Sequence, residues 1–344
     1  MTDTNDSKTM EFKGDILNIP DDTNYWFVRA GSGAIYYDDF YINNYIGEDS
    51  NGLNLYNLYS IPTSLKSANS AILERYKTLF REHDLKLFDE RNKDQEKNVE
   101  VLHQEKVTET RRSTKRANRV FLFVEQMKIG DFIFVPSNHS SEFLVGIIVS
   151  DCFDGYIKHT KLLDIDEDTD DEYGYKISPY EFKRKIYWIK ELSENEFPNE
   201  LAGYRNVHQS ITNITDSSDL LNPCISSQYF YKNNYYIRIG VNTTEKISSL
   251  DWLTFQNLIK DIVGEKKLNN IFQKQKVQSP GLIILFGGGV ALLFVIIGIL
   301  FGTTEVDIKT KHVSVKTTTK DLLSYFTNKD IEKEMKEQEL EQKK

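Results

Sequence analysis

The sequence predicts an α+β fold that combines a small β-barrel with flanking helices, a small α+β extension and one transmembrane helix. Short apolar and aromatic runs separated by turn residues indicate the strands of a small barrel. Two longer stretches repeat apolar residues every three or four positions, which is the spacing of amphipathic helices. One uncharged apolar stretch, Gly281 to Gly302, is long enough to cross a membrane as a helix.

The composition limits the class of protein. The 344 residues include 19 Tyr and 20 Phe, so the chain can build a hydrophobic core and is not disordered throughout. The two cysteines, Cys152 and Cys224, exclude a disulfide scaffold and a cysteine-rich zinc site. The formal net charge of −9 argues against a general nucleic-acid coat, although a local basic patch is compatible with it.

The first structured segment follows a polar N-terminus, residues 1–20, which we interpret as flexible. We expect a strand from Tyr25 to Ala30 and a tight turn at Gly31–Gly33. A returning strand is then expected from Ala34 to Tyr37.

Two helices are expected before the central strands. Residues 64–83 place apolar side chains every four positions and predict the first helix. Residues 84–112 are charged and lack this periodicity, which indicates a flexible insertion or an exposed helix. The second helix is expected from Ser113 to Met127, with Ser113 or Thr114 as its N-terminal cap.

Three buried strands then follow, each an apolar run bounded by turn residues. They are predicted at Phe132–Pro136, Phe143–Val149 and Lys185–Ile189.

The order of these segments resembles a known domain. The segments WFVRAG, MKIGDFIFVP, FLVGIIV and KRKIYWI follow one another over about residues 24–212. This order is similar to the PUA/EVE-like domain, a small β-barrel at the front of restriction endonucleases that attack modified DNA and in other prokaryotic defence proteins. The most specific feature is a hydrophobic helix followed by Lys-x-Gly-Asp and an apolar strand that ends in proline. We therefore place this domain at residues 21–212.

The resemblance implies a base reader whose aromatic pocket holds a flipped or modified base. The candidate pocket residues by position are Trp26, Arg29, Tyr36 and Trp188. The alternative for each tryptophan is packing in the core. The chain departs from the family in its acidic loop after Asp164 and in its insertion, and neither suits a tight DNA-binding rim. It also shows no restriction-type nuclease core after the barrel.

A smaller unit is expected at residues 213–276. Tyr229 to Val241 predicts a β-hairpin with Asn233 and Asn234 in the turn, since asparagine tolerates positive φ. Leu250 to Val263 predicts a helix, and a lysine-rich connector follows it.

The predicted membrane segment lies at residues 277–304. Its 22-residue apolar run would form a helix of about 33 Å, which matches a hydrocarbon core of about 30 Å. With no signal peptide ahead of it, the large N-terminal part is expected to stay in the cytoplasm of a single-pass cell-membrane protein. A charged tail, residues 305–344, would follow the span.

Small residues form one stripe on this predicted helix. The stripe is a candidate oligomer face, because small residues let helix backbones approach closely in lipid. The alternative is that glycine is simply common in membrane helices. The members of the stripe are Gly287, Ala291, Gly298 and Gly302.

A basic strip begins at Lys106 and places six positive charges within 14 residues. One interpretation is an anion-binding surface for the phosphates of a nucleic acid or nucleotide. The other is an exposed helix face. The candidate ligand-binding residues in the strip are Arg111, Arg112, Lys115, Arg116 and Arg119.

No enzyme or metal motif is present in the sequence. The six histidines lack the spacing of metal ligands, and there is no P-loop, Rossmann glycine signature or GxSxG motif. Asp164 to Asp170 alternate as in calcium loops, but the required glycine and glutamate are missing. We therefore expect a non-enzyme without metal or cofactor.

Together these features suggest a membrane-anchored receptor. Its cytoplasmic barrel would bind a nucleic-acid or nucleotide-type ligand and signal through an oligomerising transmembrane helix, in antiviral defence by the resemblance. The expected partners are that ligand, the lipid bilayer and further copies of the chain. One alternative is a membrane-tethered scaffold that binds a partner protein without a nucleotide ligand. Another is a tethered nuclease with an unrecognised active site.

Overall fold

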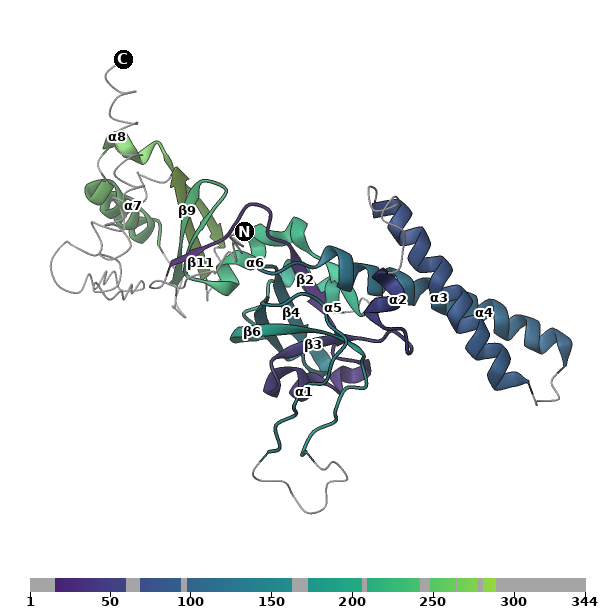
Figure 1. Ribbon diagram of the computed structural model, residues 1–344. Coiled ribbons are helices and arrows are strands. Elements are labelled where there is room, and N and C mark those ends of the chain that lie inside the picture. Colours follow the sequence, from purple (N-terminus) through teal and green to yellow (C-terminus); the bar gives the residue numbers. More distant parts are fainter. Residues whose placement is uncertain are drawn as a thin grey trace, which may run out of the picture. The chain divides into compact units, whose positions relative to one another are not determined.

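The computed structural model describes residues 16–59, 69–93, 98–162, 173–205, 209–241, 248–263, 265–276 and 281–288 (Figure 1). The chain divides into two compact units. The larger unit is Thr23–Ser218, and the smaller unit combines Met1–Asp22 with Asp219–Lys344. Each unit contains one curled β-sheet with helices, so the architecture is mixed α/β.

The larger unit has a six-stranded sheet in the order β3-β6-β5-β4-β2-β7. Strands β2 and β4 are parallel, and the other neighbours are antiparallel. The strands are β2 (Tyr25–Val28), β3 (Tyr45–Glu48), β4 (Phe132–Pro136), β5 (Glu142–Ile148), β6 (Phe182–Ser193) and β7 (Ile211–Asn213).

The centre of this sheet is buried on both faces. Every residue of β4 is buried, and so is all of β5 after Glu142. A strand covered on both faces needs apolar residues at successive positions, which explains the continuous apolar runs in the sequence. The predicted strand at Phe132–Pro136 is confirmed, and β5 and β6 confirm the next two with shifted bounds.

Helices α3 and α4 form a long hairpin that we call the α3–α4 hairpin (Figure 1). At the sheet end of the hairpin, Tyr76, Phe80 and Val120 are fully buried in the core cluster. A π-helical turn, Leu122–Gln126, connects α4 to the segment that leads into β4. The helices of the larger unit are α1 (Tyr37–Ile42), α2 (Leu55–Tyr59), α3 (Asn69–Asn92), α4 (Val99–Phe121) and α5 (Ala202–Arg205).

Two local predictions for the larger unit are wrong. The returning strand at 34–37 is absent, because the chain turns through left-handed backbone at Gly33 and Ala34 and enters α1. The second helix begins at Val99 and not at Ser113, because Asn98 caps it by accepting the backbone N–H of Glu100 at 2.9 Å. Within the described residues, the charged insertion is therefore helical at 84–92 and at 99–112.

A buried arginine stabilises the π-helical turn. Arg184 is 2 % exposed, and its guanidinium donates to the carbonyl oxygens of Phe123, Val124 and Ser150 at 2.8–3.0 Å. The bonds to Phe123 and Val124 satisfy carbonyl groups of the π-turn, and the bond to Ser150 joins Arg184 to the segment after β5.

The smaller unit has a five-stranded sheet in the order β1-β8-β9-β11-β10. The predicted hairpin is confirmed as β8 and β9, with Lys232 and Asn233 in left-handed conformation in its turn. Helix α7 confirms the predicted helix and packs on the sheet, where Gln256 donates to Gln273. The elements are β1 (Ile16–Asn18), α6 (Ser218–Ile225), β8 (Gln228–Tyr231), β9 (Asn234–Val241), α7 (Ser249–Val263), α8 (Glu265–Leu268), β10 (Ile271–Lys276) and β11 (Gly281–Gly288).

The predicted transmembrane helix is wrong, and the fold class is corrected accordingly. The described part of the segment, Gly281–Gly288, forms strand β11, which pairs with β9 on one side and β10 on the other, and the rest of it lies outside the described residues. Ile283 and Leu285 are each 1 % exposed, so a buried central strand accounts for this part of the apolar run. Within the described ranges, no helix has the length and apolar character needed to cross a membrane.

The oligomer stripe predicted on that helix is also corrected. Gly287 lies in β11, where an added Cβ would come within 2.2 Å of the Asn270 carbonyl oxygen. The glycine is needed for this close approach of two backbones. Ala291, Gly298 and Gly302 lie outside the described residues.

Candidate functional site

Two tight turns of the larger unit enclose a recess of about 470 Å³, which we call the turn recess. One turn follows β2 and the other joins β4 to β5. The size lies within the range of small-molecule sites. The lining residues are Arg29, Ala30, Gly31, Gly33, Ala34, Pro136, Ser137, Asn138, His139, Ser140, Glu194 and Ala202.

Both turns contain backbone in the left-handed region. Gly33 and Ala34 have φ values of 64° and 58°, and His139 and Ser140 have φ values of 57° and 56°. For residues other than glycine, such backbone is strained, and it persists only where the surrounding structure holds it. Strained residues of this kind concentrate at functional sites, so the turn recess is a candidate site.

The turn recess is lined by hydrogen-bonding groups. Arg29 Nη2 donates to the carbonyl oxygen of Tyr204 at 3.5 Å, and burial lowers the pKa of Arg29. Glu194 supplies an acceptor of opposite charge, while Asn138 and His139 supply exposed polar side chains. Glycine and alanine walls also let a ligand approach the backbone closely. The recess therefore suits a polar ligand that both donates and accepts hydrogen bonds.

The aromatic residues expected to form the pocket lie elsewhere. Trp26 is 2 % exposed in the core, and its Nε1 donates to Asp131 Oδ2 at 2.8 Å. Trp188 donates to the Phe40 carbonyl oxygen at 3.3 Å and packs against the core. Tyr36 contacts Tyr180 edge to face. Among the described residues, Arg29 is the one predicted pocket residue in the turn recess, and no Phe, Tyr or Trp is among the residues that line it.

The Lys-x-Gly-Asp motif has a structural role here. Asp131 accepts from the Trp26 indole and from the backbone N–H groups of Asn24 and Lys128, both at 3.0 Å. Burial raises the pKa of Asp131, and these bonds oppose that shift. Asp131, the last residue of the motif, therefore connects the start of β2 to the start of β4.

Two residues of the predicted basic strip are held in ion pairs. Arg119 Nε lies 2.9 Å from Glu48 Oε1, and Ser210 donates to the other oxygen of Glu48 at 3.1 Å. Arg116 pairs with Asp84 and with Asp49, whose Oδ2 is 3.4 Å from Arg116 Nε. Both arginines therefore join α4 to neighbouring elements of the larger unit.

The other three residues of the strip are exposed. Arg111 and Lys115 lie one helical turn apart, and no ion pair is seen for either among the described residues. Arg112 lies 3.6 Å from Glu109 Oε2, and its side chain is 69 % exposed. Of the five ligand-binding residues predicted in the strip, three are therefore exposed on the surface of α4.

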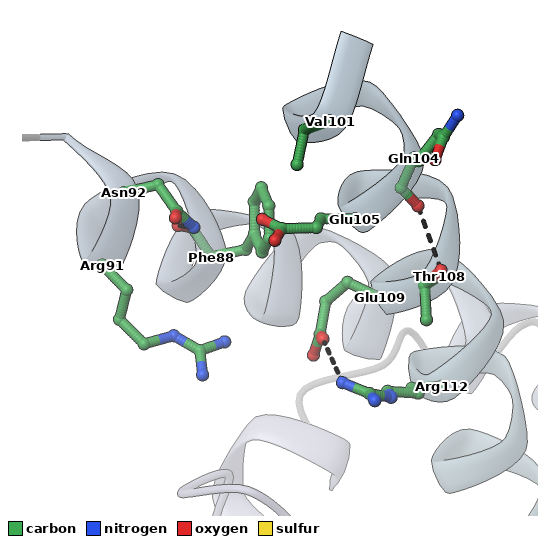
Figure 2. A pocket seen from close by; sticks show the side chains of 9 residues that line it. All are labelled: Phe88, Arg91, Asn92, Val101, Gln104, Glu105, Thr108, Glu109 and Arg112. Atoms are coloured by element: carbon green, nitrogen blue, oxygen red, sulfur yellow. Dashed lines mark hydrogen bonds and ion pairs between the residues drawn. The ribbon is translucent and has the colours of Figure 1, made fainter. Parts of the chain in front are cut away.

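Arg112 also lines a second recess, of about 580 Å³, between the ends of α3 and α4 that lie away from the sheet (Figure 2). We call it the hairpin recess. Figure 2 shows Arg91 on one side of the recess and Arg112 beside Glu109 on the other, with the ion pair of Glu109 and Arg112 as a dashed line. The lining residues are Phe88, Arg91, Asn92, Val101, Gln104, Glu105, Thr108, Glu109 and Arg112.

A third polar cluster surrounds the buried carboxylate of Asp39. It accepts from the Tyr45 hydroxyl, the Ser178 backbone at 2.7 Å and Asn43 Nδ2 at 2.8 Å. His159 Nδ1 lies 3.0 Å from Asp39 Oδ1. With so many donors on one carboxylate, the cluster serves to hold α1 and two loop segments together. Within the described part of the chain, no group of three or more His, Cys, Asp or Glu side chains is placed to hold a metal ion.

Sequence reasoning missed most of the turn recess. Asn138, His139 and Ser140 lie in a short polar stretch between two buried strands, which indicates only a turn. Their nearness to Arg29 depends on the parallel pairing of β2 and β4, which no local pattern shows.

The comparisons with known proteins give no relative: no family model, curated protein or solved structure matches the chain.

Proposed function

We propose that the larger unit is a non-enzymatic binding module that takes a nucleic-acid or nucleotide-type ligand in the turn recess. The observation that carries the proposal is the meeting of two strained turns around a recess lined by Arg29, Asn138 and His139. Binding residues are often presented on loops by a rigid scaffold, and here the scaffold is the buried β4–β5 pair. The sequence resemblance to PUA/EVE-like readers supports the same ligand class and a setting in prokaryotic defence.

The exposed cations of α4 support a ligand that carries phosphate. Arg111 and Lys115 are available to contact backbone phosphates, which are read by charge without base specificity. Affinity that depends on these residues is expected to fall with rising salt concentration. Arg116 and Arg119 take no part in this role, because both serve as ion-pair partners inside the larger unit.

The test is a binding panel with the full chain. Fluorescence anisotropy would be measured with short single- and double-stranded DNA and RNA, with modified-base oligonucleotides, and with cyclic and linear nucleotides. We expect His139→Ala and Asn138→Ala to weaken binding about tenfold, which corresponds to losing one good hydrogen bond. His103→Ala, an exposed histidine on α4, is the matched control and should bind normally. Absence of binding across the panel, or equal binding by all three variants, contradicts the proposal.

A protein-binding scaffold is the second candidate function. Exposed tyrosines in α2 and in the segment next to it favour this function. Tyr56 and Tyr156 are 78 % and 85 % exposed. The backbone N–H of Leu55 donates to Asp154 at 2.7 Å, which brings their two segments together. Tyrosine is common at protein interfaces. On this alternative, replacing Arg111 and Lys115 would leave function intact, whereas Tyr56→Ala would impair capture of a partner.

A further inference from the structure

Helix α4 carries opposite charges on one face, next to the hairpin recess. Glu105 and Arg112 both line the recess and are seven residues apart. Seven residues are two helical turns, so the two side chains share a face about 10 Å apart along the helix axis. Thr108, a small residue, lies between them on that face.

The hairpin recess is suited to receive a guanidinium group. Phe88 lines the recess but is only 7 % exposed, and Glu105 and Glu109 line it one helical turn apart. The two carboxylates can hold an arginine through charge-assisted hydrogen bonds. Glu109 is itself 8 % exposed, so an ion pair there is shielded from water.

Arg112 lies at the rim of the same recess and reaches outward. Its side chain is 69 % exposed, and its pair with Glu109 spans 3.6 Å, longer than a hydrogen bond. A guanidinium has five N–H donors, so Arg112 can bind a further carboxylate. One surface therefore presents a projecting cation and, beside it, a hollow that fits a cation.

We propose that this face of the α3–α4 hairpin binds a second copy of the chain. In an antiparallel pair of α4 helices related by a two-fold axis near Thr108, each Glu105 faces Arg112 of the other copy. Each Arg112 then enters the hairpin recess of the other copy. A two-fold interface requires a self-complementary surface, and these opposite charges provide one.

Each hairpin recess is lined by two acids, Glu105 and Glu109, and by two bases, Arg91 and Arg112. In the proposed pair the two copies exchange their Arg112 side chains, so this balance of charges is kept. Arg91 also donates to the carbonyl oxygen of Leu87 at 3.2 Å, so it stays on its own helix. The recess thus holds two acids and two bases, which fits an association that weakens with salt. The inference is independent of the proposed ligand.

The experiment uses sedimentation velocity on the full chain over a range of protein and salt concentrations. We expect a dimer that dissociates on dilution and in high salt. Glu105→Arg and Arg112→Glu should each weaken dimerisation at least tenfold, since each creates two like-charge contacts. An equimolar mixture of these two variants should associate again, because every contact between them pairs opposite charges.

The matched controls are Glu82→Arg and Lys86→Glu, exposed residues of α3 that do not line the hairpin recess. They should leave dimerisation unchanged. Should either charge reversal lower the helix content by circular dichroism, Glu105→Gln and Arg112→Gln replace it, with a smaller loss expected from each. A chain that stays monomeric at about 100 µM in low salt overturns the proposal. So does a dimer that is unaffected by these changes, or a mixture that fails to associate.

Discussion

Replacing Arg119 by alanine should destabilise the larger unit, because it leaves a buried carboxylate without its counter-ion. Arg119 Nε lies 2.9 Å from Glu48, whose side chain is 5 % exposed. At that separation and an effective dielectric constant of about 20, Coulomb's law gives roughly 6 kcal/mol of attraction. Desolvation offsets part of this, and breaking one side of a buried pair costs about 3–5 kcal/mol. Because Arg119 is 30 % exposed, we expect the lower end, about 3 kcal/mol.

The loss should depend on pH in a stated direction. Burial raises the pKa of Glu48, and the charge of Arg119 opposes that shift. Without Arg119 the pKa of Glu48 rises further, so the folded variant takes up a proton more readily than the unfolded chain. A group whose pKa is raised by folding contributes most stability below its unfolded pKa, and that contribution is lost as pH rises through its folded pKa. The deficit of Arg119→Ala should therefore be largest near neutral pH and shrink toward acidic pH.

Urea unfolding followed by circular dichroism measures this effect. With a slope of about 2 kcal/mol per molar, 3 kcal/mol lowers the unfolding midpoint by about 1.5 M. The control is Arg111→Ala on the same helix, which is exposed and should change stability by less than about 0.5 kcal/mol. Adding Glu48→Gln to Arg119→Ala should recover part of the loss. Equal stability of Arg119→Ala and Arg111→Ala, or a deficit that does not change with pH, would refute the reasoning.

Three further predictions concern the folded core. Arg184→Met should lower the free energy of unfolding by about 3 kcal/mol, because it leaves three carbonyl groups without a buried donor; a loss below about 1 kcal/mol in urea unfolding contradicts this. Gly287→Ala should destabilise the smaller unit, because the new Cβ meets the Asn270 carbonyl oxygen. Unchanged thermal unfolding of the variant would contradict this close approach. Burial raises the pKa of the Cys152 thiol to about 12, so alkylation of that residue near pH 8 should be slow in the folded chain and fast in urea. Rapid modification of Cys152 in the folded chain, detected by mass mapping, would contradict its burial.

The sequence predicted β2, β4, β5 and β6 because their signal is local, but it missed the short strands β3 and β7. Phe132–Pro136 is a continuous apolar run between a Gly-Asp turn and a proline, and these limits define a short buried strand. The start of α4 was harder to predict, because hydrophilic residues of an exposed helix lack the apolar spacing that marks a buried face. The cap at Asn98 was the signal that could have placed it.

The membrane prediction failed for a different physical reason. A helix in lipid and a central strand in protein both need successive apolar residues, so the run after Gly281 is compatible with either. For Gly281–Gly288 the pairing of β11 with β9 and β10 shows a strand, and the rest of the run lies outside the described residues. A glycine at position 287 suits close packing of membrane helices, as predicted, and it equally suits the close approach of the Asn270 backbone that the structure shows.

The candidate site could be predicted only in part. Arg29 was identified by its position in the segment that resembles the PUA/EVE-like domain, but His139 lies 110 residues later in the sequence. Their meeting depends on strand order. The strip on α4 was predicted as one surface, yet its arginines divide into exposed residues and partly buried ion-pair partners. The acids that bind Arg116 and Arg119, Asp84 and Glu48, come from α3 and β3.

A crystal structure of the full chain with the tightest ligand from the binding panel tests the central claim most directly. The account predicts ligand density in the turn recess, with polar atoms within hydrogen-bond distance of Arg29, Asn138 or His139. Trp26 and Trp188 should keep their positions in the core. Ligand density stacked on Trp188, or bound away from both turns, would contradict the account.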